Sequence, residues 1–137
     1  MMPAIGRFLL DTTSSSLCSK GMRRFCPILT GRPKYFIPAV VLGELFFGAA
    51  KSGRPSENTA KVERFAAGRS IVSSDLDVAR EYGRLKQHLK GKGRPIPEND
   101  IWIAAAATHH GMVLVIRDRH FDEVAGLHTS DRAAHPP

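Results

Sequence analysis

The sequence predicts an α/β domain built on a parallel sheet. Short apolar segments alternate with segments of helical periodicity, which is typical of strands joined by crossover helices. The apolar run at 112–116 (MVLVI) indicates a buried strand, because strands covered on both faces are continuously hydrophobic. This run directly follows a helical segment, 96–111, whose start and stop signals are both clear.

The 96–111 segment is the helix around which we expect the chain to be organised. Pro97 starts it with a preset φ, and the acidic Glu98 and Asp100 favour the positive end of the helix dipole. Residues 101–107 make an apolar helix thin enough to pack closely on a sheet, and Gly111 is a natural stop. Asp100 therefore opens a helix that precedes a buried strand.

The other elements follow from local periodicity and turn residues. In chain order we expect a strand at 7–10, an extended segment at 35–37, a helix from Pro38 to about Ala50, a turn at 52–55, an exposed helix at 56–68 with Val62 and Phe65 inward, a short strand within 70–73, a helix at 75–90, a loop at 91–97 and a tail from Leu127. We expect Ser74 to cap the 75–90 helix, with Asp77 at the N3 position of a capping box.

Composition indicates one soluble domain with an acidic partner. The 137 residues are 42% hydrophobic and 24% charged, which suits a single domain over 1–130 with a disordered tail at 131–137. We expect a cytoplasmic protein without a membrane segment, since there is no long apolar run, no signal-peptide layout and only two cysteines. The net charge of +7 favours RNA or DNA first and an acidic protein second, although many small basic proteins are simply soluble.

Four acidic residues stand at strand ends and on helices: Asp11, Glu44, Asp100 and Asp118. Each has a simpler explanation, as a loop, turn, dipole or solvated helix residue. Together they indicate a metal site, because clustered carboxylates repel unless a cation lies among them. Oxygen ligands without histidine suit Mg²⁺ or Mn²⁺, which can polarise a phosphodiester for hydrolysis. A metal-dependent nuclease is therefore the predicted class.

Four motifs carry a resemblance to a known family. LLDT at 9–12 is weak alone, but FIPAVVLGELFFGA at 36–49, GRPIPENDIWIAA at 93–105 and VLVIRDRHF at 113–121 are specific. Together they resemble the PIN-domain family, in particular the VapC-type toxin ribonucleases. The resemblance implies a three-layer α/β/α fold with a central, mainly parallel sheet.

The resemblance also implies an endoribonuclease toxin that uses Mg²⁺, with Mn²⁺ as a substitute. Its implied partners are an RNA substrate such as tRNA or rRNA, a cognate antitoxin and a second copy in a homodimer. By position, Asp11 and Asp100 match the most direct metal ligands of the family. Glu44 and Asp118 would complete the metal shell or position water.

Residues 13–34 depart from the family pattern, in which Asn and an apolar helix follow the first aspartate. A one-base shift turns each TCN serine codon into NTC, which always encodes Phe, Leu, Ile or Val. One allowed reading of 13–27 (TSSSLCSKGMRRFCP) is NIVIALFKGDEAVLS, an amphipathic helix with Asn beside Asp11. We therefore hypothesise an out-of-frame segment; a naturally divergent loop is the alternative.

The out-of-frame hypothesis has consequences for charge, order and activity. The shifted reading removes the two arginines of 13–27 and introduces two acids, which lowers the net charge from +7 to +3 and weakens the charge argument. We expect the segment as written to be irregular and poorly ordered. The alternative functions are a catalytically impaired homologue that only binds antitoxin or RNA, and a basic nucleic-acid-binding module without a recognition motif.

Several other residues have structural and functional interpretations. We expect His109 and His110 to interact with the helix terminus, His120 not to be catalytic, and Trp102 to pack in the core or a dimer interface rather than stack on a base. The cations expected to contact phosphates are Lys61, Arg64, Lys92 and Arg94. Phe46 and Phe47 are expected at an antitoxin surface, because so apolar a helix is hard to bury in a small domain.

Overall fold

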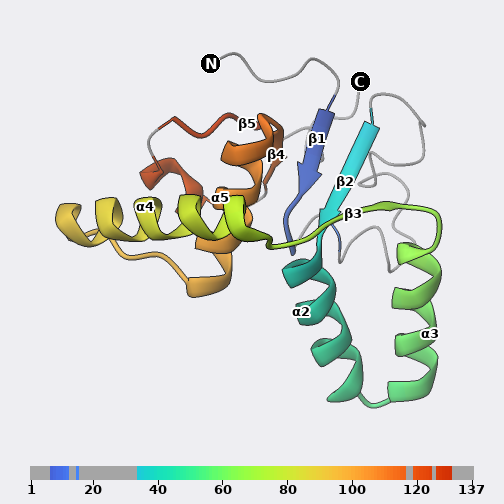
Figure 1. Ribbon diagram of the computed structural model, residues 1–137. Coiled ribbons are helices and arrows are strands. Elements are labelled where there is room, and N and C mark those ends of the chain that lie inside the picture. The colour runs from blue at the N-terminus through green and yellow to red at the C-terminus, as the bar shows by residue number, and fades with distance from the viewer. Residues whose placement is uncertain (1–6, 13–14, 16–33, 117–118, 125, 131–137) are drawn as a thin grey trace.

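The computed structural model describes residues 7–12, 15, 34–116, 119–124 and 126–130 (Figure 1). Its strands form one parallel five-stranded sheet of order β3-β2-β1-β4-β5. The strands are β1 (Arg7–Leu10), β2 (Lys34–Pro38), β3 (Ser70–Val72), β4 (Val113–Val115) and β5 (Thr129–Ser130). The helices are α2 (Ala39–Ala50), α3 (Pro55–Ala66), α4 (Leu76–Lys92), α5 (Glu98–His110) and the 3-10 helix η3 (Arg119–Glu123).

The predicted three-layer α/β/α class with a parallel sheet is confirmed. Helix α2 packs mainly on α3, and α4 packs mainly on α5. The α4–α5 pair lies to the left of β1, and the α2–α3 pair extends below the carboxyl end of β2 (Figure 1). No helix within the described ranges combines the length and apolar character needed to cross a membrane.

Strand β1 is the centre of the sheet. Phe8 pairs with Tyr35 of β2, and Leu10 pairs with Val115 of β4. Leu9 and Leu10 are fully buried, as expected for a strand covered on both faces. The residue that follows Leu10 therefore emerges at the carboxyl edge of the sheet, between two neighbouring strands.

The helix predicted at 96–111 is confirmed with its end signals. Helix α5 begins at Glu98 after Pro97, whose φ of −53° and ψ of 142° place it at the N-cap. It ends at His110, and Gly111 follows as the C-cap residue with a φ of 64°, donating its amide to the carbonyls of Ala107 and Thr108. Glycine suits this position, because side-chain-bearing residues rarely adopt the left-handed conformation. The burial of the alanine run, Ala104 to Ala107, lets α5 pack closely on its neighbours.

Two sequence predictions were wrong. The N-cap of α4 is Asp75, not Ser74, because the Asp75 Oδ1 accepts a hydrogen bond from the Val78 amide at 3.0 Å. The tail predicted from Leu127 contains β5, which pairs in parallel with β4. Neither of the β5 residues is apolar, so periodicity could not reveal a strand that depends on pairing with the sheet edge. The proposed tail at 131–137 lies outside the described residues.

The N-terminus of α4 meets the C-terminus of α5 in a cluster of titratable side chains. His109 Nε2 lies 3.9 Å from Asp77 Oδ2, and the His109 and His110 rings meet edge to face at 4.8 Å. Burial and the neighbouring His109 lower the pKa of His110, as does Arg7, against an opposing effect of the two aspartates. The Val78 amide lowers the pKa of Asp75, with smaller help from both histidines.

We expect stability to fall as the pH drops below about 6.5, the ordinary pKa of histidine. The pKa of His110 is lower in the folded chain than in the unfolded chain, so the unfolded chain takes up a proton on His110 at a higher pH. The free energy of unfolding therefore decreases as the pH falls toward the folded pKa. Thermal midpoints of the wild type and of His110→Gln, measured between about pH 5 and 7.5, test this. The His110→Gln profile should be flatter, whereas His88→Gln, at an exposed position on α4, should follow the wild type. Identical profiles for all three would rule out His110 as the source.

Candidate active site

Asp11 lies directly after the central strand β1 and is only 3% exposed. Its amide donates to the Val115 carbonyl at 3.3 Å, and its carbonyl accepts from the Ser15 amide at 3.0 Å. The first bond ties Asp11 to the end of β4, and the second starts a helical turn. A carboxylate buried at the carboxyl edge of a parallel sheet is costly, and such edges are where sites form in α/β folds.

Glu44 is the only charged residue of α2, and it is half-buried. Its Oε1 accepts a hydrogen bond from Thr12 Oγ1 at 2.9 Å. This bond joins the residue next to Asp11 to a helix 32 positions later in the chain. The bond therefore holds the Glu44 carboxylate beside the residue that follows Asp11, and its role as a site residue stays a prediction.

Thr12 is a candidate site residue that sequence reasoning did not single out. The available signal was its place directly after Asp11, where a strand end passes into a helix. A hydroxyl there can hydrogen-bond to the backbone at the helix start or to a side chain of another element, and sequence alone does not distinguish these two roles. The contact with Glu44 shows that Thr12 orients a carboxylate.

Asp100 lies in the first turn of α5 and is half-buried, with its amide donating to the Pro97 carbonyl at 3.0 Å. Helix α5 contacts α2, which carries Glu44, and β4, whose end is bonded to Asp11. These two contacts fix the position of α5. Glu98 of the same turn is different, because its carboxylate is exposed and bound by Lys86 Nζ at 3.0 and 3.2 Å. The two acids point in different directions around the helix, since two residues correspond to about 200°.

The other predicted site residues have separate outcomes. Asp118 lies outside the described residues, so its place in the site stays a prediction. Among the residues that the structure describes, no three His, Cys, Asp or Glu side chains form a group able to hold a metal ion. The described candidates, Asp11, Glu44 and Asp100, nevertheless offer only carboxylate oxygens, and that donor chemistry fits Mg²⁺ or Mn²⁺ rather than zinc.

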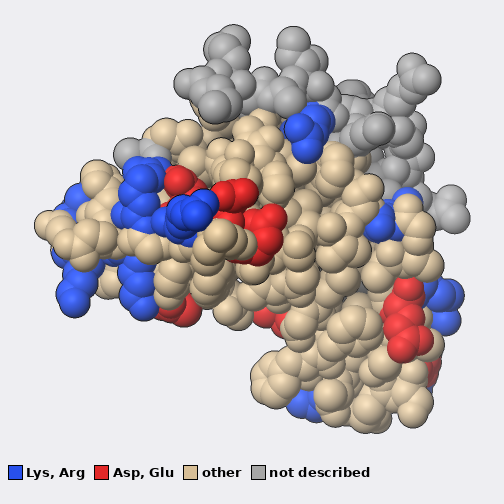
Figure 2. Space-filling model, in the orientation of Figure 1, with Lys and Arg blue, Asp and Glu red and all other residues tan. Residues whose placement is uncertain are grey.

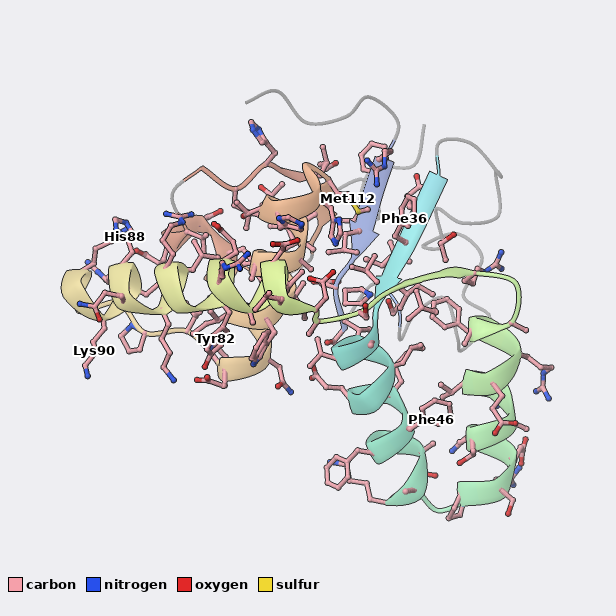
Figure 3. All side chains as sticks on the ribbon, viewed as in Figure 1. Phe36, Phe46, Tyr82, His88, Lys90 and Met112 are labelled. Atoms are coloured by element: carbon pink, nitrogen blue, oxygen red, sulfur yellow. The ribbon has the colours of Figure 1, made fainter. Side chains whose placement is uncertain are left out.

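The remaining candidates belong to helix packing. Trp102 stacks on Tyr82 with ring centroids 4.0 Å apart and an interplanar angle of 14°, so it joins α5 to α4. Tyr82 lies on the side of α4 next to the lower part of α5 (Figure 3). The packing interpretation of Trp102 is thus confirmed. The side chain of His120 lies outside the described part of the chain.

Lys61 and Arg64 do not form one surface with Lys92 and Arg94. The first two belong to α3, whereas the other two lie at and beyond the C-terminal end of α4, on the opposite side of the molecule (Figure 1). Lys and Arg side chains gather around that end of α4 (Figure 2), where His88 and Lys90 point outward (Figure 3). The expected phosphate contacts of these cations stay a prediction, and they would divide between two separate surfaces.

Comparison with known proteins decides the family. The family profile described as PIN domain matches residues 19–127. The chain belongs to the PIN-domain family. The match includes Glu44, Asp100 and Asp118 but begins after Asp11, so the case for Asp11 rests on its position in the fold.

Sequence relatives place this PIN domain in the VapC type. It is 35% identical over 99 residues to Ribonuclease VapC2 of Haemophilus influenzae, covering 72% of this chain and 75% of that protein. It is 31% identical over 130 residues to the tRNA(fMet)-specific endonuclease VapC of Salmonella typhimurium, covering 91% and 97% of the two chains.

Solved structures agree with this assignment. The DNA-bound VapBC of Salmonella typhimurium matches with a TM-score of 0.80 and 30% identity over 95% of this chain and 98% of that one. VapBC2 of Rickettsia felis, bound to a promoter DNA fragment, matches with a TM-score of 0.81 over 90% and 97% of the chains. At 24% identity, the second likeness bears on the fold alone.

Proposed function

We propose that this PIN domain is a divalent-metal-dependent endoribonuclease, the toxin of a toxin–antitoxin pair. The observation that carries the proposal is the junction of Asp11 with Glu44 through Thr12 at the carboxyl edge of the sheet. The relatives named as VapC ribonucleases support the same activity. Because two relatives are named tRNA(fMet)-specific endonucleases, tRNA is the first substrate to test and rRNA the second.

Asp11, Glu44, Asp100 and Asp118 would hold the metal. A bound Mg²⁺, or Mn²⁺ in its place, would neutralise and polarise the scissile phosphodiester. The residues of the chain set the geometry: Thr12 fixes the direction of the Glu44 carboxylate, and burial shields Asp11 from water. The basic end of α4 would attract the RNA backbone from outside the acidic site.

We expect purified protein to cleave tRNA in Mg²⁺, to lose this activity in excess EDTA, and to regain it when Mg²⁺ or Mn²⁺ is restored. In the proposed site the metal ion would polarise the phosphodiester and offset the repulsion between the carboxylates that hold it, so removal of the metal should abolish cleavage. Gel analysis of end-labelled tRNA measures the outcome. Full cleavage in excess EDTA would exclude the metal mechanism.

A catalytically impaired homologue is the second candidate, because residues 13–34 depart from the family pattern beside Asp11. Such a protein would bind tRNA or antitoxin without cutting RNA in Mg²⁺. Binding and cleavage assays on the same preparation separate the two functions.

We also propose a homodimer, which sedimentation equilibrium of the purified chain can test.

The antitoxin partner is proposed to dock on α2. Phe47 is 66% exposed, and its ring meets only the Lys51 ammonium at 5.0 Å among its described ring contacts. Phe46 instead lies between α2 and α3 (Figure 3). The space-filling view shows a mainly uncharged face over α2, whereas charges line the outer edge of α3 (Figure 2).

We expect Phe47→Asp to weaken antitoxin binding by about 30-fold, as for a central aromatic contact of an interface. Because Phe47 is exposed, the thermal midpoint of the variant should stay within about 2 °C of that of the wild type. Leu76→Asp is the matched control, since Leu76 is 67% exposed on a different surface. Calorimetry with the cognate antitoxin measures the affinities. Unchanged binding by Phe47→Asp, or equal losses in both variants, would reject α2 as the docking surface.

A further inference from the structure

Ser15 is a fully buried polar residue beside the active site. It is 0% exposed, and its hydroxyl has no hydrogen-bond partner in the part of the chain that the structure describes. Its amide donates to the Asp11 carbonyl at 3.0 Å. A buried hydroxyl without a partner is unfavourable, because it loses its hydrogen bonds to water and gains none in return.

The place of Ser15 in its helix explains why an apolar side chain would suit this position. Asp11 is not helical, but its carbonyl accepts the first helical hydrogen bond, so it is the N-cap. Leu10 is then N′ and Ser15 is N4, the two positions that a hydrophobic staple joins across a helix start. Leu10 is fully buried, as such a staple requires. Ser15 places a hydroxyl at the N4 position, where an aliphatic side chain would complete the hydrophobic staple.

We propose that Ser15 is a positioning residue of the active site, at a position built for an aliphatic side chain. The turn that it anchors carries Asp11, and also Thr12, which orients Glu44 through a 2.9 Å hydrogen bond. A weak staple loosens both carboxylates at once. The catalytic part of this inference rests on the proposed nuclease function. The shifted reading of 13–27 places valine, an aliphatic residue, at position 15.

The test compares Ser15→Val with Ser15→Thr, because valine and threonine have nearly the same shape and differ in the hydroxyl. We expect Ser15→Val to unfold about 3 to 6 °C above Ser15→Thr. The amide at position 15 should exchange with solvent about fivefold more slowly in Ser15→Val than in wild type, since its helical bond to Asp11 opens less often. Equal midpoints and equal exchange rates would overturn the proposal.

Thr108→Val is the control for stability alone, since the Thr108 hydroxyl is also buried without a partner among the described residues but lies near the far end of α5. It should raise the midpoint without slowing exchange at position 15. Well below both midpoints, Ser15→Val should raise kcat/KM for tRNA cleavage by about three- to tenfold, and Thr108→Val should not.

Activity that Ser15→Thr keeps and Ser15→Val loses would overturn the proposal, because the hydroxyl would then serve the reaction. If no variant and no wild-type protein cleaves RNA, the proposed nuclease function fails. Midpoints and exchange rates still decide in that case whether position 15 anchors the turn of Asp11.

Discussion

Asp100→Asn is expected to lower kcat/KM for metal-dependent RNA cleavage by about 10²- to 10³-fold, with the fold preserved. The substitution keeps the shape of the side chain but removes a charge and, in the proposed site, an anionic metal ligand, whose loss is worth several kcal/mol at a phosphodiester site. An amide oxygen can still serve the first turn of α5. The lost charge near the helix dipole should lower the thermal midpoint by only about 1 to 4 °C.

Glu98→Gln is the matched control for Asp100→Asn. Both residues lie in the first turn of α5, and both substitutions remove one negative charge near the same helix terminus. Glu98 is exposed and paired with Lys86, so its loss should change cleavage by less than about twofold. Measurement of kcat/KM and thermal midpoints for both variants tests the prediction. Normal cleavage by Asp100→Asn would make Asp100 purely structural, and equal losses would point to helix electrostatics instead of metal binding.

Replacement of residues 13–27 by NIVIALFKGDEAVLS is expected to raise the thermal midpoint by about 10 °C or more and to increase RNA cleavage. The new segment offers several aliphatic side chains for burial, each worth about 1.5 to 3 kcal/mol, against the entropy of ordering a helix. The replacement also places an amide side chain beside Asp11, where it can hydrogen-bond a carboxylate.

A version of the same replacement that retains Thr13 separates stability from chemistry. It should gain nearly the whole increase in midpoint, because most of the new aliphatic side chains remain. Its cleavage should rise less, since it lacks the amide next to Asp11. Calorimetry gives the thermal midpoints, and tRNA cleavage gives the activity, of the wild type, the full replacement and the version that retains Thr13. A replacement that is less stable than the natural chain would refute the out-of-frame hypothesis, whose own segment lies almost entirely outside the described residues.

Local signals were enough to predict most elements of the fold. Pro97 and Gly111 mark the ends of α5, because each has a backbone preference that acts within one turn. The buried strand β4 and the inward residues Val62 and Phe65 of α3 follow from periodicity, which records which face of an element meets the core. The acids Asp11, Glu44 and Asp100 were proposed as site residues from their place relative to these elements.

The tertiary structure decided the features that depend on neighbours distant in the sequence. Ser74 and Asp75 can both cap a helix, and in the folded chain Asp75 accepts the capping hydrogen bond from the Val78 amide. Strand β5 exists because β4 offers an edge for pairing, although its two residues carry no apolar pattern. Thr12 and Glu44 meet across 32 positions, and Ser15 is buried despite its hydroxyl, since packing fixes contacts and burial that no local preference encodes.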